Sequence, residues 1–428
     1  MTVSSIKATA LSGALLSVLA VPAGVQAQSA AGTETGGIQL TFGVTFRLEA
    51  QDNRGLSSTD EQSSFEAASI LSFGLLSETR AQRFTLDVTG SLRALNTDLD
   101  VANANGFVEP SVALSYDISN ASSRFSISAQ MNESDLSDSG TVLDDDGFEI
   151  ISDGTAVRRA TRLETSYDWG DDRRFGFGVF ARYLATDYRG GTVQDTAGDS
   201  VNDSERTTLG ARARFDLSEA ATLTSTLSFQ DFEEDGVAGS RETVSLDNTL
   251  TIDRPLGAVN FNLGITDTEE GQRYATSIGR SYETPRGIFS GALGATRAAS
   301  GGTFLTANLN YTHPLPRGAL SFGLGRTVSS SNDDDSERLN TNLSFGYNQD
   351  LTPVSRISLN MSWSEAETTS TGLSTTSTTL GATYSHELTQ DWGLNVGYRH
   401  RIRDDDTSGR ASNNTIFLEM SRAFVTRF

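Results

Sequence analysis

The stretch Ile38–Glu49, IQLTFGVTFRLE, decides the fold. Its even positions are all apolar, whereas its odd positions carry Gln, Thr, Gly, Thr, Arg and Glu. Successive side chains of a β-strand point to opposite faces, so this alternation predicts a strand with one apolar face and one polar face. Segments 258–266 (AVNFNLGIT) and 355–363 (SRISLNMSW) repeat the pattern.

The same alternation recurs to the end of the chain, and we find no convincing amphipathic helix. It predicts about twenty strands, within a range of roughly 16–20. Most exceed the usual strand length in globular proteins and match the nine to eleven residues that cross a tilted bilayer. The predicted strands lie near residues 38–50, 63–77, 82–96, 107–118, 123–133, 155–168, 174–188, 205–217, 221–232, 240–253, 257–267, 272–283, 287–298, 302–312, 318–329, 339–349, 355–366, 375–387, 392–403 and 412–424.

Long and short connections are expected to alternate. A longer polar loop is predicted after the first strand and after every second strand that follows, with tight turns between. Short turns at one rim and longer loops at the other are typical of transmembrane barrels, whose short turns face the periplasm. The predicted fold class is therefore all-β: a single antiparallel up-and-down barrel over residues 38–428, with short periplasmic turns and longer extracellular loops.

The N-terminal segment Met1–Ala27 has the pattern of a secretory signal peptide. Lys7 precedes an apolar run, and Val25-Gln26-Ala27 offers a small-x-small cleavage site. A membrane-anchor helix is the alternative, although the apolar run is shorter than a membrane span. We expect export and cleavage, with residues 28–37 forming a short periplasmic stub before the barrel.

Composition excludes several classes of function. The 428 residues contain no cysteine, which excludes a disulfide scaffold, a thiol nucleophile and Fe–S ligation. The net charge of −22 argues against nucleic acid as a partner, because phosphate binding needs a basic face. The hydrophobic share of 36% is low for a soluble core, but a barrel in lipid needs no large core.

Aromatic residues recur shortly before the predicted tight turns, on the apolar side of their strands. An aromatic ring once per hairpin at one rim indicates an interfacial girdle at the membrane surface. Ordinary tyrosines of a soluble sandwich are the alternative interpretation. The girdle candidates are Tyr116, Tyr167, Phe215, Tyr282, Tyr311, Tyr347 and Tyr384.

The last strand ends on an aromatic residue. Its alternating positions Ile416, Leu418, Met420, Phe424 and Phe428 resemble the C-terminal assembly signal of outer-membrane β-barrel proteins, while Arg422 departs from the apolar pattern. That resemblance implies recognition of Phe424 and Phe428 by the barrel assembly machinery. More broadly, residues 38–428 resemble Gram-negative porin-type barrels, although no named porin matches.

The porin resemblance implies location in the bacterial outer membrane, with membrane lipid, lipopolysaccharide and small hydrophilic solutes as partners. It implies no cofactor. Assembly into a homo-oligomer is left open.

Neighbouring predicted strands carry arginines on their lumen side. In general porins the third long loop folds inward and sets acidic groups against a wall of arginines. By that resemblance Arg162, Arg182, Arg212 and Arg214 would face Asp144, Asp145 and Asp146 across a constriction. The alternative is that the arginines pair with lumen carboxylates such as Asp87, Glu164 and Asp247 and stiffen the wall. The pore-lining candidates are Arg158, Arg162, Arg182, Arg212, Arg214, Asp144, Asp145 and Asp146.

Two hypotheses for function follow. The first is a channel for passive diffusion of small hydrophilic solutes or ions. The second is a non-conducting surface barrel with an adhesion, envelope-assembly or structural role. Catalysis is not expected, because the three histidines are isolated and no nucleophile motif occurs. Acidic loop triplets are interpreted as solvated charge rather than as a metal site, with bridging of divalent cations to lipopolysaccharide as the alternative.

Overall fold

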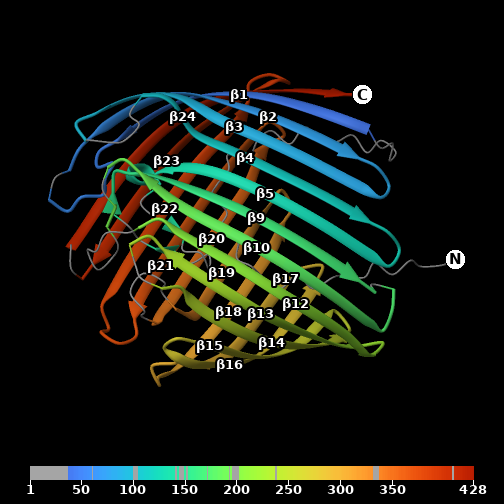
Figure 1. Cartoon of the computed structure of the whole chain (residues 1–428). Coiled ribbons are helices and arrows are strands. Elements are labelled where there is room, and N and C mark those ends of the chain that lie inside the picture. The colour runs from blue at the N-terminus through green and yellow to red at the C-terminus, as the bar shows by residue number, and fades with distance from the viewer. Residues whose placement is uncertain are drawn as a thin grey trace.

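The computed structural model is a single closed barrel (Figure 1). It describes residues 37–428 except 60, 100–104, 140–141, 144–148, 151–152, 171, 192, 195–201, 237–238, 331–336 and 407–408. The predicted signal peptide, and the predicted stub apart from Gly37, lie outside the described residues. In the part of the chain that is described, no helix is long and apolar enough to cross a membrane.

Twenty strands form one antiparallel sheet, as the alternation predicts. Consecutive barrel strands are neighbours, and β24 pairs with β1 to close the ring, from Gln39 opposite Arg427 to Gln51 opposite Thr415. The strands are β1 (Gly37–Gln51), β2 (Ser64–Glu78), β3 (Gln82–Thr97), β4 (Asn105–Ser119), β5 (Ser123–Asp135), β9 (Val157–Trp169), β10 (Phe175–Arg189), β12 (Ser204–Ser218), β13 (Ala221–Glu234), β14 (Arg241–Arg254), β15 (Gly257–Thr268), β16 (Gly271–Thr284), β17 (Gly287–Arg297), β18 (Thr303–Leu315), β19 (Gly318–Ser330), β20 (Glu337–Thr352), β21 (Ser355–Thr368), β22 (Ser374–Glu387), β23 (Trp392–Asp405) and β24 (Gly409–Arg427).

Cross-strand pairing keeps like faces together. Phe42 lies opposite both Phe73 and Phe424, so the apolar faces of β1, β2 and β24 form one surface. Large apolar side chains are exposed on that surface around the whole barrel, and the opposite parity, which is mostly polar, lines the lumen. An apolar exterior and a polar interior suit a barrel that lipid surrounds.

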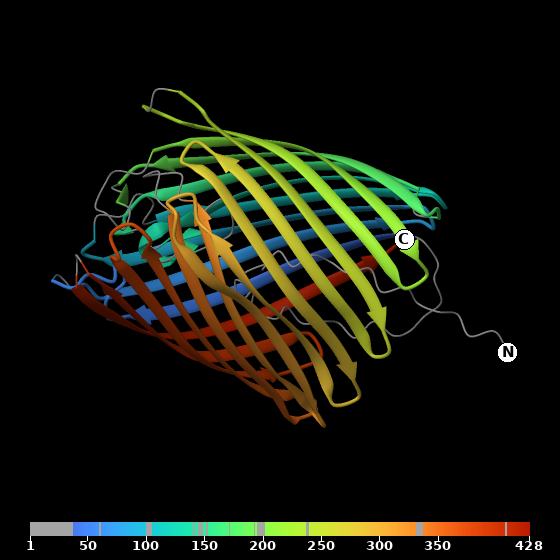
Figure 2. The same cartoon turned by 90° about the horizontal axis from the view of Figure 1, so that it is seen from below.

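The two rims differ, although not everywhere as predicted. We call the rim at which β1 begins and β24 ends the inner rim, and the opposite one the outer rim. The inner rim holds tight turns such as 219–220 and 255–256 (Figure 2). At the outer rim, the first connection spans 52–63 and the third spans 136–156. The prediction of a longer loop at every outer connection is wrong at β15–β16, which a two-residue turn, 269–270, joins.

Small elements occupy the long outer connections. A single-turn helix, α1 (Leu136–Ser139), follows β5. The strands β6 (Val142–Leu143) and β7 (Glu149–Ile150) pair with each other, and β8 (Asp153–Gly154) pairs with β11 (Val193–Gln194) of the next outer connection. The third and fourth outer connections are therefore hydrogen-bonded to each other.

One register shift interrupts the wall between β3 and β4. Thr89 pairs with Ser111 but Ser91 pairs with Val108, so β4 carries one extra residue at this bulge. The bulge contains Glu109, whose φ of 51° is in the left-handed region. It is followed by Pro110, and a bulge is one of the few places in a sheet where proline is tolerated.

The final strand is longer than predicted. It was expected to end near residue 424, but β24 continues to Arg427 because the first residues of β1 pair with it. Phe428 extends this pairing, since its backbone N–H donates to the carbonyl of Ile38 at 2.8 Å. Arg422 points to the lipid side, pairs with Asp391 at 3.1 Å and lies over the ring of Phe424.

Candidate functional site: the barrel lumen

The predicted arginines share one face of three adjacent strands. Arg182 of β10 is the cross-strand partner of Glu164 of β9, and Arg162 pairs with Leu184 on the same face. Arg212 and Arg214 of β12 pair with Gly178 and Gly176. Most exposed large apolar residues of these strands, such as Phe177 and Leu209, occupy the other parity. Arg158, Arg162, Arg182, Arg212 and Arg214 therefore lie on the lumen side, together with Phe180 and Leu184.

These arginines contact the wall that carries them. Arg182 Nε lies 2.8 Å from Glu164 Oε1, and Arg212 Nη1 lies 3.9 Å from Asp168 Oδ1. Arg214 donates to the backbone carbonyls of Gly170 and Arg173. The Arg162, Arg182 and Arg212 side chains are 46%, 48% and 50% exposed, so they border open lumen rather than a packed interior.

Arg158 lies at the outer end of the same wall. Its Nη2 is 3.5 Å from the hydroxyl of Thr186 on β10, at the limit of a hydrogen bond.

The predicted acidic partners Asp144, Asp145 and Asp146 lie outside the described residues. The outer connection that carries these residues joins β5 to β9. Its short strand β7 contacts β21. In the ring order, β21 is separated from β5 by β4, β3, β2, β1, β24, β23 and β22, so it belongs to the far wall. The third outer connection therefore reaches from one side of the barrel to the other.

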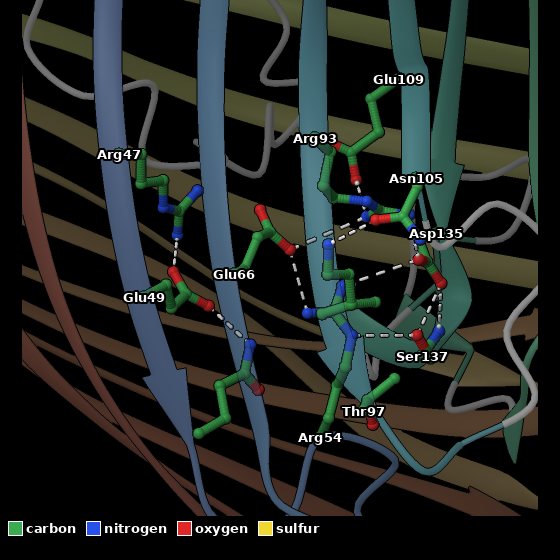
Figure 3. Close-up of polar contacts among 12 residues, drawn as sticks. Arg47, Glu49, Arg54, Glu66, Arg93, Thr97, Asn105, Glu109, Asp135 and Ser137 are labelled. Atoms are coloured by element: carbon green, nitrogen blue, oxygen red, sulfur yellow. Dashed lines mark hydrogen bonds and ion pairs between the residues drawn. The ribbon is translucent and has the colours of Figure 1, made fainter.

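A cluster of buried charges at the outer end of β2–β5 was not predicted (Figure 3). Arg54, from the first outer connection, is completely buried, and its Nη1 lies 3.1 Å from Glu66 Oε2 on β2. Its Nη2 lies 3.6 Å from Asp135 Oδ2 at the end of β5, and its Nε donates to the hydroxyl of Ser137 at 3.3 Å. We call Arg54, Glu66, Arg93, Glu109, Asp135 and Ser137 the first-loop anchor.

Arg93 is the wall residue at the centre of the first-loop anchor. Its side chain is 1% exposed, and Nη2 lies 2.9 Å from Asp135 Oδ2. Its Nη1 lies 3.4 Å from Glu109 Oε1, at the bulge in β4. The bulge thus places a carboxylate beside a buried guanidinium, which needs charge compensation in a poorly hydrated position.

A second cluster lies on the lumen side of β23, β24 and β1. Glu49 accepts a hydrogen bond from Arg47, also visible in Figure 3, and Arg399 Nη2 lies 3.5 Å from Glu49 Oε1. Arg47 also approaches Glu419 of β24 at 3.6 Å. Asn413 is fully buried and donates to Gln51. The outer part of this wall is therefore packed with ion pairs and amides.

Part of these clusters could have been found in the sequence. Glu66 and Arg93 lie at polar parity in predicted strands, towards the ends that adjoin the long loops. Parity alone thus places them in the outer lumen, as it places the arginines of β9, β10 and β12. Arg54 carries no such signal, because it belongs to a connection, where no periodicity tells whether a side chain faces water or the lumen.

The aromatic candidates form a row on the lipid side, near the inner rim. Tyr116 pairs with Phe84, and Tyr167 pairs with Phe125. The neighbouring strands therefore add aromatic rings to the candidates, and one ring pair, Phe175 with Phe215, has its centroids 5.1 Å apart. The same parity and rim hold Tyr282, Tyr311, Tyr347 and Tyr384. Their role as an interfacial girdle stays a prediction.

Among the described residues no group of three or more His, Cys, Asp or Glu side chains is arranged to hold a metal ion. Of the acidic triplets predicted at the outer rim, 233–235 and 404–406 are described, and both are tied into the protein. Glu234 accepts a hydrogen bond from Asn202 at 2.9 Å. Asp405 accepts a hydrogen bond from Thr375 at 2.7 Å, and Asp406 accepts one from the backbone of Ser374 at 2.8 Å.

Sequence comparisons give no relatives. No protein-family model matches the chain, and no curated protein matches it. Solved structures do match. A variant of the ferric enterobactin receptor of Pseudomonas aeruginosa, in complex with enterobactin, superposes with a TM-score of 0.52 at 10% identity, over 92% of this chain and 82% of that one. The same receptor in complex with BCV-L6 gives 0.51, also at 10% identity, with coverage of 92% and 82%.

The outer membrane protein opdK, also from Pseudomonas aeruginosa, covers 91% of this chain and 99% of its own, at 12% identity and a TM-score of 0.41. At these identities the likeness concerns the fold. The chain is a 20-strand barrel similar to bacterial outer-membrane proteins, and the predicted fold class is confirmed.

Proposed function

We propose that the protein is an outer-membrane channel for passive diffusion of small hydrophilic solutes or ions. The observation that carries this proposal is a closed ring of twenty strands whose inner face is polar. Sixteen to eighteen strands already enclose an aqueous channel in porins, so twenty can enclose at least as wide a lumen. The half-exposed lumen arginines of β9, β10 and β12 support water-filled space beside that wall.

Reconstitution tests the proposal directly. Purified protein in planar bilayers should give discrete current steps, and in liposomes it should admit small sugars. A barrel that is folded and inserted, yet gives neither current nor swelling, would show that it does not conduct.

One observation favours the second candidate, a non-conducting surface barrel. The first outer connection folds inward far enough for Arg54 to be fully buried among wall carboxylates. With the third connection reaching β21, two connections cover parts of the outer opening. A barrel closed in this way would present its loops to partners outside the cell rather than pass solutes. The bilayer recording separates the two candidates.

Within the channel, we propose that the lumen arginines of β9, β10 and β12 form one side of a constriction. The reach of the third connection to β21 supports an inward fold of this connection. Opposed fixed charges would order water and sort polar solutes by charge. The ion pair between Arg182 and Glu164 supports the competing interpretation, in which the arginines stiffen their own wall.

The remaining partners follow from a barrel in the outer membrane. Lipid covers the apolar exterior, as it does for this class of fold. Lipopolysaccharide at the outer rim and the barrel assembly machinery at the last strand are proposed on the same basis. Binding of lipopolysaccharide is tested by comparing the gel mobility of unheated and heated protein, purified with and without lipopolysaccharide.

A further inference from the structure

Fixed charge is divided unevenly around the lumen. The buried clusters and the lumen arginines lie on β23, β24, β1–β5, β9, β10 and β12. On β13–β22, the lumen-facing residues are mainly Ser, Thr, Asn and Gly. The exceptions are Asp247, which pairs with Gly264 and interacts with Arg273, and charged residues towards the strand ends such as Arg338 and Arg356. We call the lumen-facing residues of β13–β22 the neutral wall.

Side-chain amides lie flat on the neutral wall. Asn342 is the cross-strand partner of Gly325, and a Cβ atom on that glycine would collide with Oδ1 of Asn342. Asn360 is related in the same way to Gly381. Each glycine thus leaves room for the amide of the next strand to lie along the sheet. The wall stays smooth while its donors and acceptors remain at the lumen surface.

Neutral hydrogen bonds run from strand to strand along this wall. Thr249 donates to Asn262 at 2.8 Å, and Asn262 donates to Ser277 at 3.0 Å. On β18, Asn310 donates to Asn308 at 2.8 Å, and the Asn310 side chain is exposed to the lumen. Amides and hydroxyls keep spare donors and acceptors after such bonds, because each group offers several.

The outer connections on the neutral wall are also shorter than the longest ones on the charged side. The turn between β15 and β16 spans only 269–270, and the connection between β17 and β18 spans 298–302. On the charged side, the connections 52–63 and 136–156 are long, and the first of them buries Arg54 in the lumen. Because β7 contacts β21, any narrowing of the lumen by the third outer connection has the neutral wall on one side.

We propose that solutes cross the barrel along the neutral wall and that they are uncharged polyhydroxylated molecules of the sugar class. This inference rests on the proposed channel function. A sugar hydroxyl both donates and accepts, and a wall of amides and hydroxyls can replace the water that the solute sheds. Away from Asp247 and the strand ends, an ion held against this wall would lose hydration without meeting a fixed opposite charge.

Liposome swelling with the full chain tests the solute class. The probes are sucrose, as a neutral disaccharide, and lactobionate, as an anionic sugar of similar size. We expect sucrose to enter several-fold faster than lactobionate. Equal or faster entry of lactobionate would overturn the inference while leaving the channel function intact. Absence of both swelling and single-channel current would overturn the channel function and the inference with it.

A pair of matched variants tests the path. Asn342→Leu combined with Asn360→Leu removes two amides of the neutral wall at nearly constant volume. The control is Asn132→Leu, because Asn132 of β5 faces the lumen on the charged side, opposite Ser111 of β4.

We expect the double variant to slow sucrose entry by about two- to tenfold, the range for losing one or two neutral hydrogen bonds, and the control to leave it unchanged. An equal effect of the control, or no effect of the double variant, would show that solutes do not follow the neutral wall. Circular dichroism and the heat-dependent gel shift confirm that each variant is folded.

Discussion

Arg93 Nη2 lies 2.9 Å from Asp135 Oδ2, although Arg93 belongs to β3 and Asp135 to β5, with β4 between them. Both side chains are almost completely buried. The ion pair thus spans an intervening strand on the lumen side, a separation of roughly 10 Å between strands that the long arginine side chain covers. Because Arg54 joins the same carboxylate, the pair also fixes the first outer connection to the wall.

The buried pair predicts a large loss of stability when Arg93 is removed. Arg93→Ala would remove one of the guanidinium groups that compensate the buried carboxylates of Asp135 and Glu66. Removing one partner of a buried ion pair typically lowers the free energy of unfolding by about 3–5 kcal/mol. Urea unfolding of the inserted barrel measures the loss. Arg182→Ala is the control, because the half-exposed Arg182–Glu164 pair contributes at most about 1 kcal/mol. Equal losses in both variants would contradict the role given to burial.

Release of the first outer connection should widen the outer opening. Arg54→Ala removes the side chain that ties this connection to Glu66 and Asp135. We expect more frequent current transitions, higher mean conductance and faster proteolysis within 52–63. Arg124→Ala serves as the control, because Arg124 forms an exposed pair with Asp117 at the inner rim. Unchanged conductance and proteolysis in the Arg54 variant would show that the connection does not depend on its anchor.

Replacement of the lumen arginines tests the proposed constriction. Substituting Arg162, Arg182, Arg212 and Arg214 by Ser removes four positive charges from one wall. If this wall faces the ion path, the current should shift towards cations, because fixed positive charge attracts anions and repels cations. Reversal potentials in a salt gradient measure the shift. Unchanged conductance and selectivity would leave the arginines with a structural role in their own wall.

The terminal aromatic residues predict an assembly defect. Phe424 lies on the lipid side opposite Phe42, and the Phe428 backbone pairs with Ile38. Deletion of Phe428, alone or with Phe424→Ser, should reduce the amount of folded protein in the outer membrane. Thr426→Ser, at the same end of β24, is the control. Normal insertion of the double variant would contradict an assembly role for these residues.

The strands were predictable because their signal is repeated and local. Alternation between apolar and polar residues continues through entire strands such as β1 and β21. Over that length, alternation indicates a β-strand with one apolar and one polar face. The lumen parity of Arg182 and Arg212 followed from the same rule. Boundaries were less certain where pairing rather than pattern sets the end, as at Arg427, which is ordered into β24 by its partner Gln39.

The remaining features depend on contacts between distant segments. Burial of Arg54 is decided by Glu66 and Asp135, and nothing in the local sequence of a polar connection reports such partners. The bulge at Glu109 and Pro110 inverts the parity of β4, and it was missed because the inverted part before it covers only residues 105–108.

The pairing of β1 with β24 has a consequence for how the protein is made. Gln39 belongs to the first barrel strand and Arg427 to the last, so the partner of β1 is synthesised after every other barrel strand. Until then both margins of the sheet lack hydrogen-bond partners, which is unfavourable in lipid and promotes aggregation in water. Closure of such a long-range contact is intrinsically slow. The chain must therefore be kept soluble until it is complete, and loss of the final strand should prevent closure of the whole barrel.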